Sequence, residues 1–172
     1  VFIKDFEKNA LNYTQGFDAH DFTNIKVEPN MLIALKSDWE NFEDYKNALK
    51  SKYRIKANKA DSKSEGLEGQ FLSKKEIQYY QNDLQNLYQN TIDKANFNAQ
   101  VLNLNTYTSL KDCYKEDFIV KAYFLEGKIV GFLSALKNKT HLDAHFIGLD
   151  YDLNKAHAIY PRILNDYVRL GI

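Results

Sequence analysis

Hydrophobic residues are most concentrated in the last third of the sequence, where apolar runs alternate with short polar breaks. Residues 118–125 read FIVKAYFL and residues 128–137 read KIVGFLSALK, and both runs are rich in the β-branched and aromatic residues that strands favour. Glu126-Gly127 separates them and predicts a β-hairpin, because Gly readily accepts positive φ angles. Asn138-Lys139 gives a second turn signal, and a third strand is expected to end near Asp150. The pattern therefore predicts an antiparallel β-meander.

A helix is expected after the meander, because apolar residues recur there at helical spacing. Pro161 fits a helix only in its first turn. We therefore expect the helix to begin near Ala158 and residues 150–157 to form a loop. The apolar stripe of this helix consists of Ile159, Tyr160, Ile163, Leu164, Tyr167 and Leu170.

A strand and two helices are predicted upstream of the meander. Residues 67–72 (LEGQFL) are a candidate strand, and residues 106–114 are typical of a short helix. Ser73 followed three residues later by Glu76 is a capping-box signature, which predicts the start of another helix. Its apolar stripe consists of Ile77, Tyr80, Leu84, Leu87, Tyr88 and Ile92.

The N-terminal residues carry weaker signals. Residues 1–6 could form a short strand, and the polar and aromatic stretch up to residue 24 favours a loop. Residues 31–35 (MLIAL) are typical of a buried strand, preceded by a turn or strand edge at Pro29-Asn30.

A basic helix is predicted next. Ser37 with Glu40 forms another capping-box signature, and the helix it opens is expected to end near Gly66. Seven Lys or Arg and one acid lie between Lys46 and Lys63. Such a stripe can bind a polyanion, namely RNA, a CoA phosphate tail or an anionic lipid, although charge runs more often mark a solvated helix face. The candidate polyanion-binding residues are Lys52, Arg54, Lys56, Lys59 and Lys63.

Composition bounds the class of protein. A chain of 172 residues and 20.0 kDa with 44% hydrophobic residues predicts one compact unit, with two small lobes as the alternative, and argues against disorder. Within that unit we expect an N-terminal region over residues 1–66 and a core over residues 67–172. Cys113 is the only cysteine, so no intrachain disulfide can form, and a reducing, cytoplasmic location is favoured. With no His nearby in sequence, Cys113 is expected to be a small buried residue. No apolar run approaches the roughly 20 residues that span a bilayer. Zinc-ligand spacings and Gly-rich phosphate loops are absent, so no metal is expected.

The order of elements from residue 67 resembles the first two-thirds of the GNAT acyltransferase fold. Within that superfamily the sequence is similar to the Fem-like, peptidoglycan-biosynthesis-type branch over residues 25–172. The residues that carry this resemblance are Trp39, Phe42, Tyr45, Leu49, Tyr53 and Arg54, the basic run after them, the segment Gly127-Lys128-Ile129-Val130-Gly131-Phe132, and His145-Phe146-x-Gly148 before a Tyr-rich helix.

The resemblance implies a mixed α/β (α+β) fold with a mainly antiparallel sheet, flanking helices and GNAT-like (acyl-CoA N-acyltransferase) architecture. It implies an acyl-CoA or aminoacyl-tRNA as donor substrate, and a small-molecule amine or a cell-wall precursor as acceptor. Two departures stand out. The loop 152–157 lacks the glycines usual in enzymes that use acetyl-CoA, and the fold would continue with more strands. We therefore expect the sequence, which begins at Val1 and stops at Ile172, to be incomplete at its C-terminus.

Asp143 and His145 are the main catalytic candidates. Side chains alternate along a strand, so Asp143, His145 and Ile147 are expected to share one face, with the first two Cβ atoms about 7 Å apart. A His with a near-neutral pKa can take a proton from an attacking ammonium. Tyr123 is a weaker candidate, since a Tyr can protonate a leaving group. A structural His at the sheet surface and a core Tyr are the alternatives.

The segment before the last helix is the candidate cofactor site. Backbone N–H groups and the helix dipole can bind a phosphate, although a loop without Gly approaches a pyrophosphate less easily. The residues assigned to it are Gly148, Asn154, Lys155, His157, Tyr160 and Arg162.

Three classes of function follow. The first is an N-acyltransferase or aminoacyltransferase that transfers an acyl group to an amine. The second is a binding module that keeps the fold without the chemistry. The third is an RNA-binding domain, with tRNA as one such partner, led by the basic helix. An exposed strand edge of the meander also predicts a homodimer.

Overall fold

The computed structural model describes residues 3, 6, 8–24, 31–96, 98 and 101–172. The chain divides into two compact units, 1–34 and 35–172. The first contains two short 3₁₀ helices, Lys8–Thr14 and Phe17–His20, where a loop was expected. The strand expected over residues 1–6 and the turn at Pro29-Asn30 lie largely or wholly outside the described residues.

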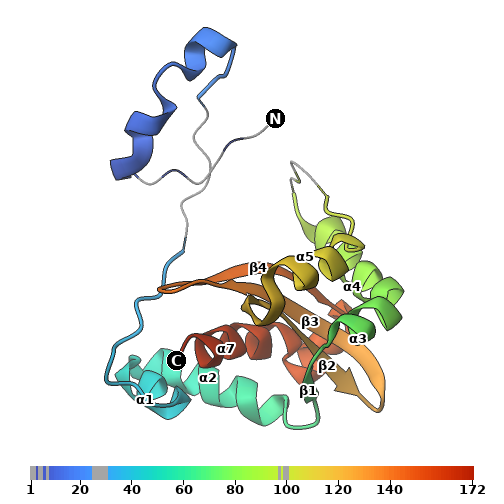
Figure 1. The fold of residues 1–172 in the computed structure, drawn as a ribbon. Helices are drawn as coiled ribbons and strands as arrows, with labels where there is room; N and C mark the ends of the chain where they lie inside the picture. Colours follow the sequence, from blue (N-terminus) through green and yellow to red (C-terminus); the bar gives the residue numbers. More distant parts are fainter. Residues whose placement is uncertain (1–2, 4–5, 7, 25–30, 97, 99–100) are drawn as a thin grey trace. The chain divides into compact units, whose positions relative to one another are not determined.

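A four-stranded antiparallel sheet is the centre of the second unit (Figure 1). Its strands are β1 (Glu68–Phe71), β2 (Phe118–Leu125), β3 (Lys128–Lys137) and β4 (Leu142–Leu149), in the spatial order β1-β2-β3-β4. Glu126 and Gly127 join β2 to β3 with φ angles of 51° and 77°, so both turn residues have positive φ. The predicted meander and the strand before it are confirmed.

One face of the sheet is covered by α3 (Lys74–Tyr79), α4 (Gln81–Lys94) and α5 (Thr106–Tyr114). The Ser73–Glu76 capping box is present, and α5 has the predicted bounds. Gly148 of β4 allows α4 to approach closely, because a Cβ there would lie 2.6 Å from backbone atoms of Leu87 and Tyr88. The core of this layer contains Ile77, Leu84, Tyr88, Tyr107, Phe118 and Phe132.

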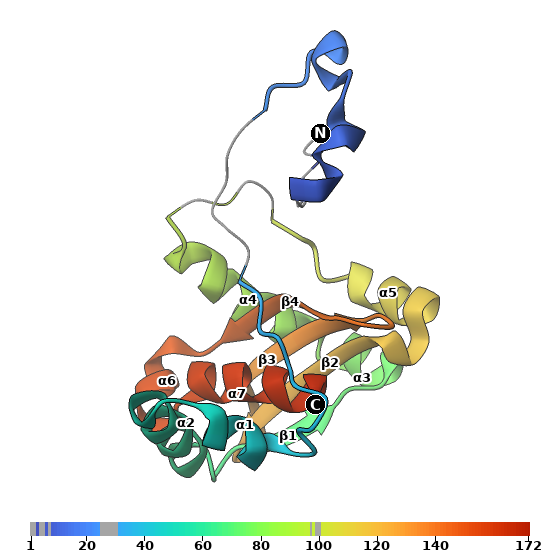
Figure 2. The ribbon, with the colours of Figure 1, turned by 90° about the vertical axis from the view of Figure 1, so that its left-hand side faces the viewer.

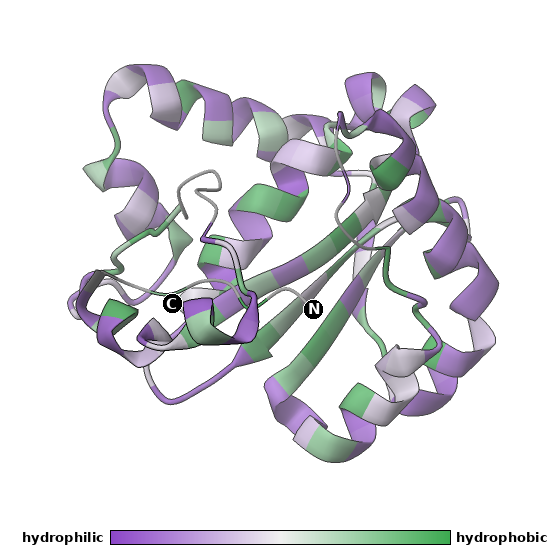
Figure 3. Cartoon of the chain, turned by 90° about the horizontal axis from the view of Figure 1, so that it is seen from above, coloured by the Kyte–Doolittle hydropathy of each residue, from purple (hydrophilic) through white to green (hydrophobic). Residues whose placement is uncertain are grey.

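The opposite face is covered by α7 (Ile159–Gly171), and α2 (Ser51–Lys63) packs on α7 (Figure 2). Ile159 and Ile163 of the predicted α7 stripe are fully buried against β3 and β4, whereas Leu164 is 47% exposed. Hydrophobic residues concentrate on the strands, and much of the surrounding helical surface is hydrophilic (Figure 3). The mixed α+β class with a mainly antiparallel sheet and flanking helices is therefore confirmed.

Two predictions for the region before β1 are wrong. Residues 31–35 form no strand, and Met31 is 95% exposed. The first helix, α1 (Phe42–Ala48), is capped by Asn41 and Asp44 rather than by Ser37 and Glu40. Asn41 directly precedes Phe42, the first residue of the helix, and its side-chain oxygen accepts hydrogen bonds from the backbone N–H groups of Glu43 and Asp44. The chain then leaves helical geometry at Leu49 and Lys50 before α2 begins.

The loop predicted over residues 150–157 is also wrong, because Tyr151–His157 forms helix α6. The Asp150 carboxylate accepts hydrogen bonds from the backbone N–H groups of Asp152 and Leu153, which stabilises the first turn. The helix ends at Ala158, which has φ 48°. Pro161 lies in the first turn of α7, as predicted.

Candidate functional site

His145 lies at an irregularity between β3 and β4. Leu133 pairs with Ile147 and Ala135 pairs with Ala144, so Ser134 faces two residues of β4, His145 and Phe146. Both rings contact aromatic residues of the α3–α5 layer, whereas Ile147 packs in the α7 layer. The expectation that His145 and Ile147 share a face is therefore wrong, because the extra residue interrupts the alternation.

The imidazole of His145 is surrounded by rings and bonded to one hydroxyl. Its centroid lies 4.2 Å from that of Phe146, 6.0 Å from that of Tyr107 and 6.2 Å from that of Phe118. Its Nδ1 lies 3.2 Å from the Ser134 hydroxyl. Burial lowers the pKa of His145, because the charged imidazolium loses solvation. His145 is therefore favoured as a neutral group.

The other two catalytic candidates are not brought to the His145 imidazole. The exposed Asp143 carboxylate lies 3.4 Å from the Asn138 side-chain amide, at the β3–β4 turn. Tyr123 is fully buried in the α7 layer on the opposite face of the sheet, and its hydroxyl donates to Asp166 at 2.8 Å. Burial raises the pKa of Tyr123, and the Asp166 charge raises it further. The core role of Tyr123 is thus favoured.

Asp166 is the centre of a charged cluster that the sequence reasoning missed. Its carboxylate is fully buried and accepts from Lys121 Nζ at 2.8 Å, Tyr123 Oη at 2.8 Å, Arg162 Nε at 3.1 Å and Arg169 Nη1 at 2.7 Å. Burial by itself raises the pKa of Asp166, but the hydrogen bond and charge of Lys121, with Arg162, lower it overall. A polar residue inside the apolar stripe of α7 is the signal that marks this position.

The predicted cofactor residues Asn154, Lys155 and His157 lie on α6, Tyr160 and Arg162 lie on α7, and Gly148 lies on β4; several of their polar groups bond within the chain. Asp150 occupies the N-terminus of α6, and the Asn154 carboxamide accepts from the Tyr160 N–H at 2.8 Å. Arg162 binds Asp166, and the Lys155 carbonyl accepts from Lys63. Gly148 contacts α4 as described above. A phosphate would therefore compete with these internal partners at both helix starts.

The five predicted polyanion-binding residues all lie on α2, and Arg54 among them is partly buried. Lys52, Lys56, Lys59 and Lys63 are exposed along the helix, whereas Ala57 and Ala60 are buried. Asp61, the only acid of α2, points to α7, where its carboxylate accepts from Arg169 at 2.7 Å and from Asn165 at 3.0 Å. The row of lysines is thus left without acidic partners on its own helix.

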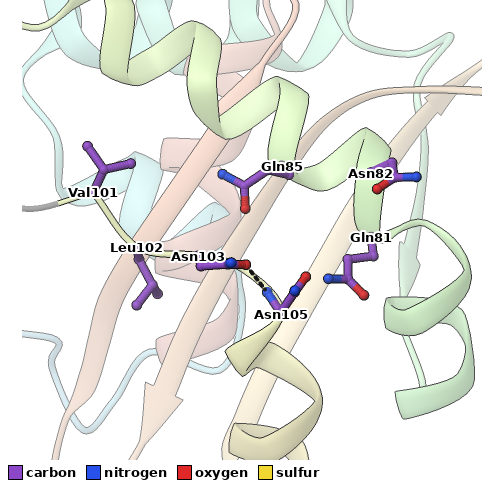
Figure 4. Close-up of a pocket in the computed structure, with 7 residues that line it drawn as sticks. All are labelled: Gln81, Asn82, Gln85, Val101, Leu102, Asn103 and Asn105. Atoms are coloured by element: carbon purple, nitrogen blue, oxygen red, sulfur yellow. Dashed lines mark hydrogen bonds between the residues drawn. The ribbon is translucent and has the colours of Figure 1, made fainter.

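Surface depressions of the second unit include two that are lined by described residues. One, of about 350 Å³, lies between α4 and residues 101–105 and is lined by amides without a charged group (Figure 4). The other, of about 500 Å³, lies beside β1, β2 and α5, and has lysines and acids at its rim. The depression between α4 and residues 101–105 is lined by Gln81, Asn82, Gln85, Val101, Leu102, Asn103 and Asn105. Neither depression includes His145.

Three further observations concern sites. Cys113 is exposed, so the expectation of a buried cysteine is wrong. Within the described ranges, no group of three or more His, Cys, Asp or Glu side chains is placed to hold a metal ion. No helix in the described part of the chain is long and apolar enough to cross a membrane.

The second unit thus defines a mixed α+β protein with a strand–helices–meander–helix order. Neither models of known families nor curated proteins match the sequence. Solved structures with some likeness include an aminoglycoside acetyltransferase from an uncultured soil metagenomic sample in complex with sisomicin, with 17% identity over 63% of this chain and 74% of that chain and a TM-score of 0.42. The corresponding complex with trehalose has 16% identity over the same shares and a TM-score of 0.42. A second such acetyltransferase, also from soil, has 17% identity over 61% and 74% and a TM-score of 0.40. These scores are too low to bear on function, which must be inferred from this chain's own elements and side chains.

Proposed function

We propose that the second unit of this chain has a GNAT-type N-acyltransferase fold and takes part in acyl transfer to an amine. The observation that carries the proposal is the order of elements around the sheet. A short strand, β1, and the helices α3 to α5 precede the antiparallel meander β2-β3-β4, and α6 and α7 follow it. Apart from α6 and the break between α3 and α4, this is the order that the GNAT resemblance of the sequence implies.

In the proposed reaction, the amine nitrogen attacks the carbonyl carbon of an acyl thioester or ester. A C–N bond forms, the C–S or C–O bond breaks, and the proton lost by the amine ends on the leaving group or on solvent. The acceptor class is a small-molecule amine, and the donor class is an acyl-CoA. In the Fem-like form of the proposal, the donor is an aminoacyl-tRNA and the acceptor is a cell-wall precursor.

A thermal-shift panel tests the donor. The protein is heated with CoA, acetyl-CoA, longer acyl-CoAs or aminoacyl-tRNA, and a donor at 100 times its dissociation constant should stabilise it by about 2.7 kcal/mol. A shift with acyl-CoA alone supports the general proposal and contradicts the Fem-like form. A shift with aminoacyl-tRNA supports the Fem-like form. Product detection with an amine panel that includes sisomicin then tests transfer.

The absence of any shift from a folded sample would favour a binding module without the chemistry. The internal capping at the start of α6 supports that alternative. Asp150 binds two N–H groups of α6. An Asp150→Ala variant separates the two cases, because opening this helix start should strengthen CoA binding if a phosphate binds there, and should leave it unchanged in a module that never binds CoA.

A second candidate function is nucleic-acid binding by the lysine row of α2. Like charges at i,i+3 and i,i+4 each destabilise a helix by about 0.2–0.5 kcal/mol, and Asp61 points away from the row. The alanines of α2 are already buried, and Tyr53 and Ile55 are the only large apolar side chains that α2 exposes, which is a small area for insertion into a lipid surface. These features favour a phosphate backbone as partner.

Fluorescence anisotropy with a labelled RNA tests this second function. Replacing Lys52, Lys56, Lys59 and Lys63 by Gln should weaken binding. The slope of the logarithm of the binding constant against the logarithm of the salt concentration should become shallower by about one unit for each phosphate that the variant no longer neutralises. A control variant replaces four other exposed lysines by Gln, namely Lys75, Lys128, Lys137 and Lys139. Equally weakened binding in both variants would show non-specific attraction and contradict the assignment to α2.

A homodimer and a cytoplasmic location stay predictions. Light scattering, which measures the molar mass in solution, tests the homodimer.

A further inference from the structure

The side chains of Tyr107, Ser134 and His145 form one continuous hydrogen-bonded chain on the α5 side of the sheet. The Tyr107 and Ser134 hydroxyl oxygens lie 2.8 Å apart, and both residues are fully buried. The Ser134 hydroxyl lies 3.2 Å from His145 Nδ1. It also lies 3.0 Å from both the backbone N and the backbone O of Phe146. Four groups therefore surround a hydroxyl that has one hydrogen and two acceptor lone pairs.

The proton count around Ser134 fixes the state of the imidazole. The Phe146 N–H can only donate, so it uses one lone pair of the hydroxyl. The Tyr107 hydroxyl is buried, and Ser134 is its only hydrogen-bond partner among the described residues, so its hydrogen uses the second lone pair. Ser134 then has no lone pair left for an Nδ1–H group, and its own hydrogen points to the Phe146 carbonyl or to His145 Nδ1. In either case Nδ1 carries no proton.

The remaining proton of the neutral ring is therefore on Nε2. In the described part of the chain, Nε2 makes no hydrogen bond, and no buried polar side-chain atom lacks a partner. Nε2 therefore keeps some contact with solvent. Among the described residues, the aromatic and hydrogen-bonding partners of the ring are Tyr107 of α5, Phe118 of β2, and Ser134 and Phe146, none of which is a carboxylate or a cation. The accessible end of His145 is an N–H donor.

We infer that His145 is held as the neutral Nε2–H tautomer by Ser134 and Tyr107, and that its Nε2–H donates a hydrogen bond to the carbonyl oxygen of an acyl group. Ser134 and Tyr107 are positioning residues in this scheme. The tautomer follows from the structure alone, whereas the acyl carbonyl rests on the proposed function. A general base needs an accessible nitrogen without a proton, so this arrangement replaces the base role expected for His145 with oxyanion stabilisation.

NMR of the ¹⁵N-labelled protein tests the tautomer without any substrate. The His145 signals should show Nε2–H with an unprotonated Nδ1 at neutral pH, whereas an Nδ1–H tautomer or an imidazolium would overturn the inference. In a Tyr107→Phe variant, Ser134 gains a free lone pair, so the Nδ1–H form should appear and the pKa of His145 should rise. Tyr167→Phe is the matched control, because the Tyr167 hydroxyl donates to the Ser134 backbone carbonyl instead of its side chain. A signal that responds equally to both variants would contradict the role of Tyr107.

Acyl-transfer rates test the donor role. Gln can present an N–H near the position of Nε2 but cannot act as a base. His145→Ala should reduce the rate by about 10²–10³-fold, the usual effect of losing one oxyanion donor, and His145→Gln should retain most of the activity. Equal losses in the two variants would overturn the donor role. If the wild-type protein transfers no acyl group, the proposed function and the donor role fail together, and the NMR result still decides the tautomer.

Discussion

Asp166→Ala should cost the protein a large part of its free energy of unfolding. The carboxylate is fully buried and accepts four hydrogen bonds, from Lys121, Tyr123, Arg162 and Arg169. The side chains of the three cations are 14%, 23% and 29% exposed, so solvent replaces their lost partner only in part. Breaking a buried pair by removing one member typically costs about 3–5 kcal/mol. Domains of this size have total stabilities of about 5–15 kcal/mol, so the effect should be obvious.

Urea unfolding followed by circular dichroism measures this loss. Asp112→Ala is the matched control, because Asp112 also pairs with a lysine, Lys74, but both side chains are about half exposed. Such surface pairs contribute about 0–1 kcal/mol. If Asp166→Ala costs no more than Asp112→Ala, the cluster does not stabilise the fold and the reasoning from burial is refuted.

The same cluster makes a prediction about pH. The pKa of Asp166 is lower in the folded protein than in the unfolded chain. Its contribution to stability is therefore fully present above the unfolded pKa and is lost as the pH falls through the folded pKa. Stability measured across the acidic range should fall less steeply in Asp166→Ala than in the wild-type protein. Parallel curves for the two proteins would contradict the lowered pKa.

Two further changes test the packing and the turn. Gly148→Ala would place a Cβ 2.6 Å from backbone atoms of Leu87 and Tyr88, so it should lower the free energy of unfolding by about 1–3 kcal/mol; an unchanged urea midpoint would mean that α4 is not held against β4 as described. Glu126→Asn should stabilise by up to about 1 kcal/mol, because Glu126 has φ 51° beside Gly127 and Asn tolerates that conformation better; a lower melting temperature would argue against this turn.

The meander, α5 and the start of α3 were predictable because their signals are local. β-branched runs, a two-residue turn with Gly and the Ser73–Glu76 pair each act within a few residues. Helix α6 was missed because it has no apolar stripe of its own and depends on the Asp150 cap. The strand predicted over residues 31–35 was wrong, because an apolar segment forms a strand only where another strand is available to pair with it.

The candidate site was less predictable than the fold, because it depends on how strands pair. His145 and Phe146 share a face only because Ser134 bonds the Phe146 backbone at an irregularity between two strands. No alternation rule contains that information. Tyr107, which bonds Ser134, and Asp166, which bonds Tyr123, lie on helices that are distant in sequence from these strand residues. The one sequence signal for Ser134 and for Asp166 is that each is a polar residue within an otherwise apolar pattern.

The pairing of Asp61 with Arg169 has a consequence for the order in which the chain folds. The two residues are 108 positions apart, and the same helices are joined by Asn165 and Ala57. Helix α2, with its row of like charges, has little to stabilise it alone, so during synthesis it must wait for α7 to emerge. The β2–β3 hairpin, in contrast, pairs strands that are adjacent in the sequence. We therefore expect α2 to dock last and, in the finished protein, to exchange its amide hydrogens first.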